Sequence, residues 1–107
     1  MIPMIDEIQN FVSKFNSDPL VKQRMGAVIR IIYINIEDVD EIYYLKLKDG
    51  QLSISESVIA PDIRITTDRK TFAGLVNETI KVGEVYNKTL KIDAPVEDLL
   101  LMSRVLR

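Results

Sequence analysis

A helical pattern opens the chain. Between Met4 and Phe15 the apolar residues recur every three or four positions and lie in one stripe of a helix, with the polar residues outside it. The pattern predicts an amphipathic helix. Ser17-Asp18-Pro19 is typical of a helix start because Pro fits the first turn, so we expect a second, short helix that reaches about Met25 and ends at Gly26.

Strand patterns follow. The segment Val28–Ile36 is rich in β-branched residues and is apolar on both alternating sets, which predicts a strand covered on both faces or one deep in a sheet. The segment Ile42–Lys48 predicts a second strand. Its apolar face carries Tyr43, Leu45 and Leu47.

The next segment predicts a hairpin and a third strand. Asp49-Gly50 is a strong hairpin signal, since Gly tolerates the positive φ that such a turn needs. Leu52, Ile54 and Val58 then alternate with polar residues, which predicts a strand with one solvent-exposed face.

A fourth strand follows Pro61, which interrupts the third. Residues 62–67 alternate so that Ile63 and Ile65 point inward and Arg64 points outward. We therefore expect a meander of four antiparallel strands.

Helical spacing returns after the fourth strand. Thr67 or Asp68 is suited to cap a helix in which Phe72, Leu75 and Val76 form an apolar contact set at i, i+3 and i+4. We expect this helix to pack on the sheet.

The C-terminal segment predicts three more elements. A short helix near residues 81–86 precedes a fifth strand around Leu90 and Ile92. Pro95 then begins a final helix that runs to Arg107. The apolar face of this helix is too broad for an ordinary surface helix, so we expect something other than one flat sheet to cover part of it.

Length and charge narrow the class of protein. The 107 residues match the size of one domain, residues 1–107, and the 47% hydrophobic content is enough to form a core without disulfides or a structural metal. Fourteen basic and sixteen acidic residues are interleaved and give a net charge of −2, so the sequence has no cluster of basic residues that would bind nucleic acid. No segment has the pattern of a signal peptide or membrane span, so we expect a soluble protein of the cytoplasm.

The composition also limits the chemistry. A chain without His or Cys has no structural zinc ligands of those types, no thiolate nucleophile and no imidazole base. The acidic run Glu37–Glu41 lacks the Gly and distal Glu of an EF-hand, so a solvated turn is favoured over a calcium loop. Nothing in the spacing of Glu56, Glu84 and Asp93 singles out an acid–base pair. We expect no metal, no cofactor and no catalytic activity.

Several local signatures resemble the sterol carrier protein type-two domain, also called the nonspecific lipid-transfer domain. They are Ile42-Tyr43-Tyr44-Leu45 running to Asp49-Gly50, Pro61-Asp62-Ile63-Arg64-Ile65-Thr66-Thr67 with Thr71-Phe72 and Leu75, and Gly83-Glu84-Val85-Tyr86 leading to Leu90-Lys91-Ile92. The similarity covers nearly the whole chain. It departs from the family at Lys88-Thr89 and at Ala94-Pro95, beside the C-terminal helix.

The resemblance implies an α+β fold: a five-stranded, mostly antiparallel sheet with helices packed on one face and an apolar tunnel between sheet and helices. It carries no catalytic residues. The residues that would line the tunnel by position are Phe72, Leu75, Val76, Val85, Tyr86, Leu99, Met102 and Leu106. For any one of these residues, ordinary core packing is favoured over ligand contact, and only the whole pattern favours a tunnel.

Two functions are consistent with this picture. The favoured one is a non-catalytic binding or carrier domain for a fatty acyl, isoprenoid or other lipid, held mainly by apolar burial. The alternative is a homodimerising interaction module whose core is filled by side chains and holds no lipid. The C-terminal helix serves as a tunnel lid, a dimer interface or a surface for transient membrane contact in these interpretations.

Overall fold

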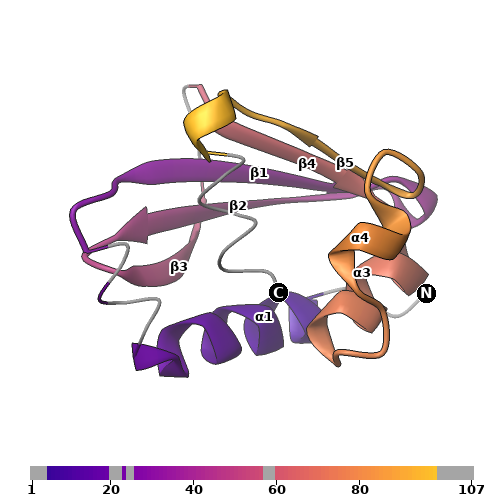
Figure 1. Ribbon diagram of the computed structural model, residues 1–107, viewed down its shortest axis with the longest axis horizontal. Helices are drawn as coiled ribbons and strands as arrows, with labels where there is room; N and C mark the ends of the chain where they lie inside the picture. Colours follow the sequence, from indigo (N-terminus) through magenta and orange to yellow (C-terminus); the bar gives the residue numbers. More distant parts are fainter. Residues whose placement is uncertain (1–4, 20–22, 24–25, 57–59, 99–107) are drawn as a thin grey trace.

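The computed structural model describes residues 5–19, 23, 26–56 and 60–98. Its elements are α1 (Ile5–Ser17), β1 (Arg30–Ile36), the 3-10 helix η1 (Glu37–Val39), β2 (Glu41–Lys48), β3 (Gln51–Ser55), β4 (Ile63–Thr67), α3 (Arg69–Val76), α4 (Val82–Val85) and β5 (Leu90–Asp93) (Figure 1). These elements confirm the predicted first helix, five strands and two later helices. The predicted second helix and final helix fall largely outside the described residues.

One sheet contains all five strands, in the order β3-β2-β1-β4-β5. The pairs β1–β2, β2–β3 and β4–β5 are antiparallel, whereas β1 and β4 are parallel. The sheet is therefore mostly antiparallel, as predicted, and β1 lies at its centre. The predicted place of β1 deep in the sheet is confirmed, but only its inner set, Ile32, Ile34 and Ile36, is buried, whereas Ile31, Tyr33 and Asn35 on the outer face are partly buried.

The expected four-strand meander is wrong. Only β1, β2 and β3 form a meander, and the chain then returns to the free edge of β1 instead of adding β4 beside β3. There Ile63 and Ile65 lie in register with buried isoleucines of β1, which buries them at the middle of the sheet. Two hydrogen bonds hold this return: the Asp62 N–H donates to the Ile31 carbonyl at 2.8 Å, and the Ile31 N–H donates to the side-chain Oδ2 of Asp62 at 2.8 Å.

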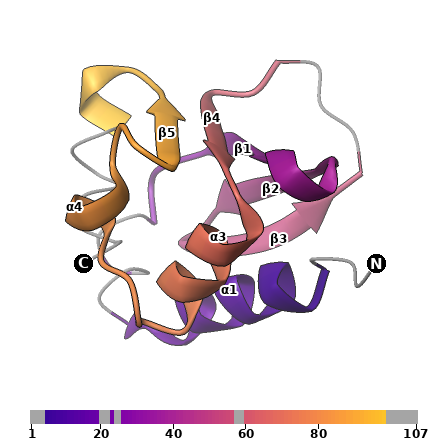
Figure 2. The same ribbon diagram turned by 90° about the vertical axis from the view of Figure 1, so that its right-hand side faces the viewer.

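The helices α1 and α3 lie on the same side of the sheet (Figures 1 and 2). Phe11 of α1 meets Phe72 of α3 edge to face, with ring centroids 5.9 Å apart. Asn16 fastens α1 to β3, because its Nδ2 donates to the Leu52 carbonyl at 2.9 Å and its Oδ1 accepts from the Leu52 N–H at 2.7 Å. This side of the sheet is the inner face.

Local signals are confirmed at the hairpin and at the start of α3. Asp49 and Gly50 have φ angles of 56° and 72°, which are the two positive values that a two-residue hairpin favours. Asp68 caps α3 by accepting a hydrogen bond from the Thr71 N–H at 2.7 Å. In β3, Leu52 is buried as expected but Ile54 is 42% exposed, since it lies on an edge strand. Val58 falls outside the described residues.

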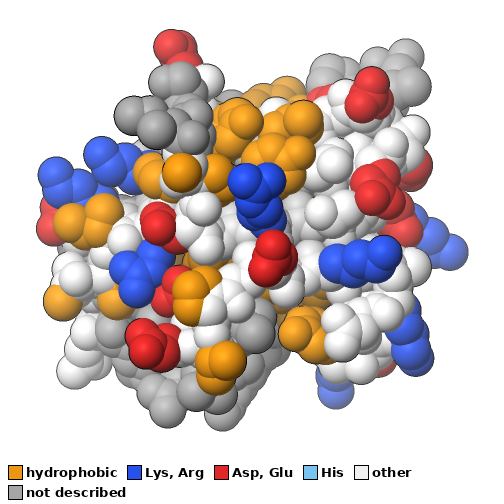
Figure 3. Space-filling model, turned by 90° about the horizontal axis from the view of Figure 1, so that it is seen from above, with side chains coloured by type: hydrophobic (Ala, Val, Ile, Leu, Met, Phe, Trp, Pro, Cys, Tyr) orange, Lys and Arg blue, Asp and Glu red, His pale blue; other side chains and the backbone are white. Residues whose placement is uncertain are grey.

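The outer face of the sheet carries a continuous cross-strand row. The row contains Ser55, Tyr44, Tyr33, Arg64 and Asp93, one residue from each strand. The two tyrosine rings meet edge to face at 5.6 Å, and the guanidinium of Arg64 lies 5.6 Å from the ring centre of Tyr33. Figure 3, seen from the side opposite α1, shows hydrophobic side chains interspersed with charges of both signs.

Candidate functional site

An apolar layer separates the sheet from its helices. Two consecutive rows cross the inner face and are apolar apart from one tyrosine hydroxyl. They are Ile54–Leu45–Ile32–Ile63 and Tyr43–Ile34–Ile65–Ile92. Against them pack Ile8 and Phe15 of α1 and Phe72 and Val76 of α3. This layer is the candidate site for an apolar ligand.

The structure brings together four of the residues predicted to line the tunnel. Phe72 and Val76 are buried in the layer, and Leu75 and Val85 are partly buried and pack against it. Tyr86 is 37% exposed at the end of α4, where it forms an isolated bridge with the first residue of β5. The other three predicted residues, Leu99, Met102 and Leu106, lie outside the described residues.

Polar groups mark one end of the layer, where β1 leads into η1. The row at this end contains Glu41, Ile36, Thr67 and Leu90. Tyr43 of the next row donates its hydroxyl to Glu41 Oε1. We refer to this part of the inner face as the η1 end.

Two buried oxygens in the described residues have no hydrogen-bond partner. They are Oγ1 of Thr67, a residue only 2% exposed, and Oε2 of Glu7. Thr71, a residue that is 4% exposed, differs because its hydroxyl donates to Thr89 Oγ1 at 2.8 Å. Sequence reasoning considered Thr67 only as a helix cap and passed over Glu7, since no local pattern shows which polar group is left without a partner.

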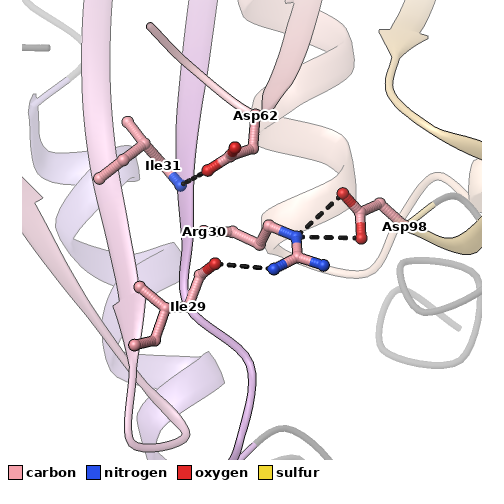
Figure 4. Close-up of polar contacts among 5 residues, drawn as sticks. All are labelled: Ile29, Arg30, Ile31, Asp62 and Asp98. Atoms are coloured by element: carbon pink, nitrogen blue, oxygen red, sulfur yellow. Dashed lines mark hydrogen bonds and ion pairs between the residues drawn. The ribbon is translucent and has the colours of Figure 1, made fainter. Parts of the chain in front are cut away.

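An ion pair marks the opposite end of the layer (Figure 4). Arg30 Nε donates to both carboxylate oxygens of Asp98, at 3.1 and 3.0 Å, and Nη1 donates to the Ile29 carbonyl at 2.8 Å. Asp98 is only 3% exposed, and its hydrogen bond to Arg30 is the largest cause that raises the pKa of the guanidinium. The pair joins the helical segment 96–98, which follows β5, to the start of β1.

Sequence reasoning missed this ion pair. One signal was present, because Arg30 is the only charged residue within the apolar run Val28–Ile36. A cation in such a strand needs a partner when the strand is central. The partner was not identifiable, since Asp98 lies 68 positions away along the chain.

The acidic residues considered as ligands or catalysts have other surroundings. In the run Glu37–Glu41, Asp38 Oδ1 accepts from the Arg69 N–H at 2.9 Å and so joins η1 to the start of α3. Glu56, Glu84 and Asp93 are all exposed. Within the residues that the structure describes, no group of three or more acidic side chains is placed to hold a metal ion, and no helix is long and apolar enough to cross a membrane.

Comparison with known proteins identifies the fold. Neither a protein-family model nor a curated protein sequence matches the chain. Among solved structures, the chain is similar to palmitated SCP2L2 from Aedes aegypti, with a TM-score of 0.67 at 14% identity over 94% of this chain and 91% of that one. It is also similar to the sterol carrier protein domain 2 of Helicoverpa armigera, with a TM-score of 0.67 at 9% identity over 97% of this chain and 85% of that one.

A third similar structure is a larger enzyme. The chain matches the sec-alkylsulfatase Pisa1 from Pseudomonas sp. with a TM-score of 0.62 at 14% identity, covering 78% of this chain but only 14% of the enzyme. The same fold thus occurs both as a separate domain and as a small part of a longer chain. The chain has the fold of the sterol carrier protein 2 domains, as its sequence pattern indicated.

Proposed function

We propose that this chain is a non-catalytic binding or carrier domain for an apolar ligand of the fatty acyl, isoprenoid or other lipid class. The observation that carries the proposal is the apolar layer of the inner face, which lies between a polar end at η1 and the Arg30–Asp98 ion pair. An amphiphile requires such an arrangement, with apolar walls and a few polar groups that orient it. The solved palmitated SCP2L2 supports a lipid as the ligand class.

The ligand would lie between the sheet and the helices. Under this proposal its walls include Phe72, Leu75, Val76, Val85, Tyr86, Leu99, Met102 and Leu106. About fifteen buried methylene groups, at about 0.8 kcal/mol each, would supply roughly 12 kcal/mol, and an association cost of about 4 kcal/mol would leave roughly 8 kcal/mol, which is the scale of micromolar binding. Apolar burial is therefore sufficient without any fixed chemistry.

Titration of the delipidated chain with a labelled fatty acid or acyl-CoA tests the proposal. We expect saturable binding with one site per chain. Native mass spectrometry of freshly purified protein adds an independent readout, because a copurified lipid appears as a mass above that of the chain. Absence of saturable binding for both probes would refute the carrier function.

The alternative of a homodimer without a lipid makes a different prediction. A strict dimer that Leu101→Asp converts to a monomer in sedimentation would support that function, whereas a monodisperse monomer would exclude it. Cytoplasmic location and transient membrane contact during lipid loading belong to the carrier proposal. Brief vesicle contact is measurable as ligand transfer that speeds up with vesicle concentration.

A further inference from the structure

The two edges of the sheet are protected in different ways. At one edge, β5 carries the charged Lys91 and Asp93, and its Leu90 carbonyl accepts from the Asn87 N–H at 2.8 Å. Charges and occupied backbone groups of this kind discourage a second strand from pairing with an edge. At the other edge, the residues of β3 (Gln51–Ser55) include no charge and no Pro, and their register with β2 continues without a bulge. The strand β3 therefore lacks the usual protection.

Two residues of β3 point their backbone groups away from the sheet. The two-residue turn makes Lys48 and Gln51 a hydrogen-bonded pair, and such pairs alternate with non-hydrogen-bonded ones along an antiparallel ladder. Leu52 and Ile54 belong to the alternate set, so their N–H and carbonyl groups face the edge. Ile54 is also 42% exposed, on the inner face of the sheet. An added strand would pair with these two residues.

Asn16 of α1 already occupies the edge at Leu52. Its Nδ2 donates to the Leu52 carbonyl at 2.9 Å, and its Oδ1 accepts from the Leu52 N–H at 2.7 Å. These are the two bonds that a residue of a neighbouring antiparallel strand would exchange with Leu52. No described residue makes an equivalent pair of bonds with Ile54. With Leu52 occupied, too little of the edge remains for a strand to add.

We infer that the edge of β3 is a dimerisation surface, that its partner is β3 of a second copy of this chain, and that Asn16 holds it closed. The strand alternates polar and apolar residues symmetrically about Ser53, so a two-fold axis at Ser53 matches polar with polar and apolar with apolar. Leu52 then pairs with Ile54 of the second copy, which buries the exposed Ile54 side chain, and no like charges face each other. This uncharged, self-matching strand fits a second copy better than a charged segment.

The contact that closes the edge also involves the apolar layer. Asn16 follows Phe15, which is only 9% exposed within the core. A second β3 can pair only after the last turn of α1 withdraws, because Asn16 holds the position that the new strand needs. That withdrawal takes Phe15 out of the layer and Asn16 off the edge together. Dimerisation is thus coupled to opening of the layer, whether or not the layer binds a lipid.

Disulfide trapping tests the pairing directly, because the chain contains no cysteine. In the dimer the two Ser53 residues form a non-hydrogen-bonded pair, whose Cα atoms lie about 4.5 Å apart, within the range that a disulfide spans. We expect Asn16→Ala combined with Ser53→Cys to form a disulfide-linked dimer about tenfold faster than Ser53→Cys alone, since both hydrogen bonds that close the edge are lost. Asn10→Ala, at an exposed position of the same helix, is the matched control and should leave the Ser53→Cys rate unchanged.

Sedimentation and hydrogen exchange test the same pairing without a cysteine. The wild type should be a monomer, whereas Asn16→Ala should show a dimer whose share grows with concentration. Ser53→Lys added to Asn16→Ala should restore the monomer, because two lysines would then face each other at the two-fold axis. In the dimer the amides of Leu52 and Ile54 should both be protected from exchange, whereas in the wild type only that of Leu52 should be protected.

A milder variant separates loss of the fold from opening of the edge. Asn16→Asp keeps the acceptor for the Leu52 N–H and loses only the donor to the carbonyl, so with Ser53→Cys it should trap at a rate between those of the wild-type and Asn16→Ala backgrounds. If Asn16→Ala unfolds, the Asn16→Asp rate decides the question. A folded Asn16 variant that stays monomeric and traps no faster, or a dimer that Ser53→Lys leaves intact, overturns the inference.

Discussion

For the substitution Gly74→Ala, helix propensity and tertiary packing predict changes in stability of opposite sign. Gly74 lies in the middle of α3, where Ala is ordinarily more stabilising than Gly by roughly 0.5–1 kcal/mol. In the fold, however, a Cβ on Gly74 would collide with the side chain of Ile80, lying 2.6 Å from its Cγ1 and 3.1 Å from its Cβ. The contact involves the base of the Ile80 side chain as well as its flexible end, so it is not relieved by a rotamer change alone.

The expected result for Gly74→Ala is a net loss of stability. Overpacking costs typically about 1–3 kcal/mol, against roughly 0.5–1 kcal/mol gained in helix propensity, and the midpoints of the two ranges leave a loss of about 1 kcal/mol. Gly83 in α4 is the matched control, since a Cβ there meets nothing within 4 Å. We expect Gly83→Ala to stabilise the chain by about 0.4–1 kcal/mol.

Thermal unfolding followed by circular dichroism measures both variants. For a domain of this size, 1 kcal/mol corresponds to a shift in Tm of roughly 4–8 °C, so the two variants should move in opposite directions by a resolvable amount. The double variant Gly74→Ala with Ile80→Ala should recover part of the loss attributed to the collision, when compared with Ile80→Ala alone. A Tm for Gly74→Ala that rises as much as that of Gly83→Ala would refute the close packing of Ile80 on α3.

Two further predictions concern polar contacts between distant segments. Arg30→Met leaves the buried Asp98 carboxylate without its partner and should lower the free energy of unfolding by about 2–3 kcal/mol. Asp98→Asn retains an acceptor and leaves only a partly exposed cation, so it should lower the free energy of unfolding by about 1 kcal/mol. Urea unfolding measures the asymmetry, and equal losses would show that Asp98 is solvated rather than buried. Asn16→Ala leaves the N–H and carbonyl of Leu52 without their partner and should cost about 1–3 kcal/mol, while the exposed Asn10→Ala in the same helix should change stability by less than about 0.5 kcal/mol. A loss at Asn10 as large as that at Asn16 would contradict the attachment of α1 to β3.

The occurrence of this fold in an alkylsulfatase shows why the function has to be argued from the site. The matched part is 14% of that enzyme, whereas the match covers 91% and 85% of the solved chains from Aedes aegypti and Helicoverpa armigera. A fold places side chains but does not by itself specify chemistry. In this chain the argument for a carrier depends on the apolar layer between the polar η1 end and the Arg30–Asp98 ion pair.

Much of the candidate site was predictable because it follows from periodicity. The spacing of Phe72, Leu75 and Val76 identified the sheet-facing side of α3, and all three pack in or against the core. The inward direction of Ile63 and Ile65 was predicted from alternation alone and is confirmed by their burial. The polar residues at the two ends of the layer were not found, since their significance depends on partners that local patterns do not specify.

The sequence by itself determined the elements, their faces and their local boundaries. Alternation and helical spacing assign a residue to a face, and the turn at Asp49-Gly50 and the cap at Asp68 act over only a few residues. The tertiary structure decided which edge of β1 received β4, because that choice depends on isoleucine burial across the whole sheet. It also decided that the Thr67 hydroxyl has no hydrogen-bond partner in the described part of the chain, since hydrogen-bond satisfaction is known only when the neighbouring segments are in place.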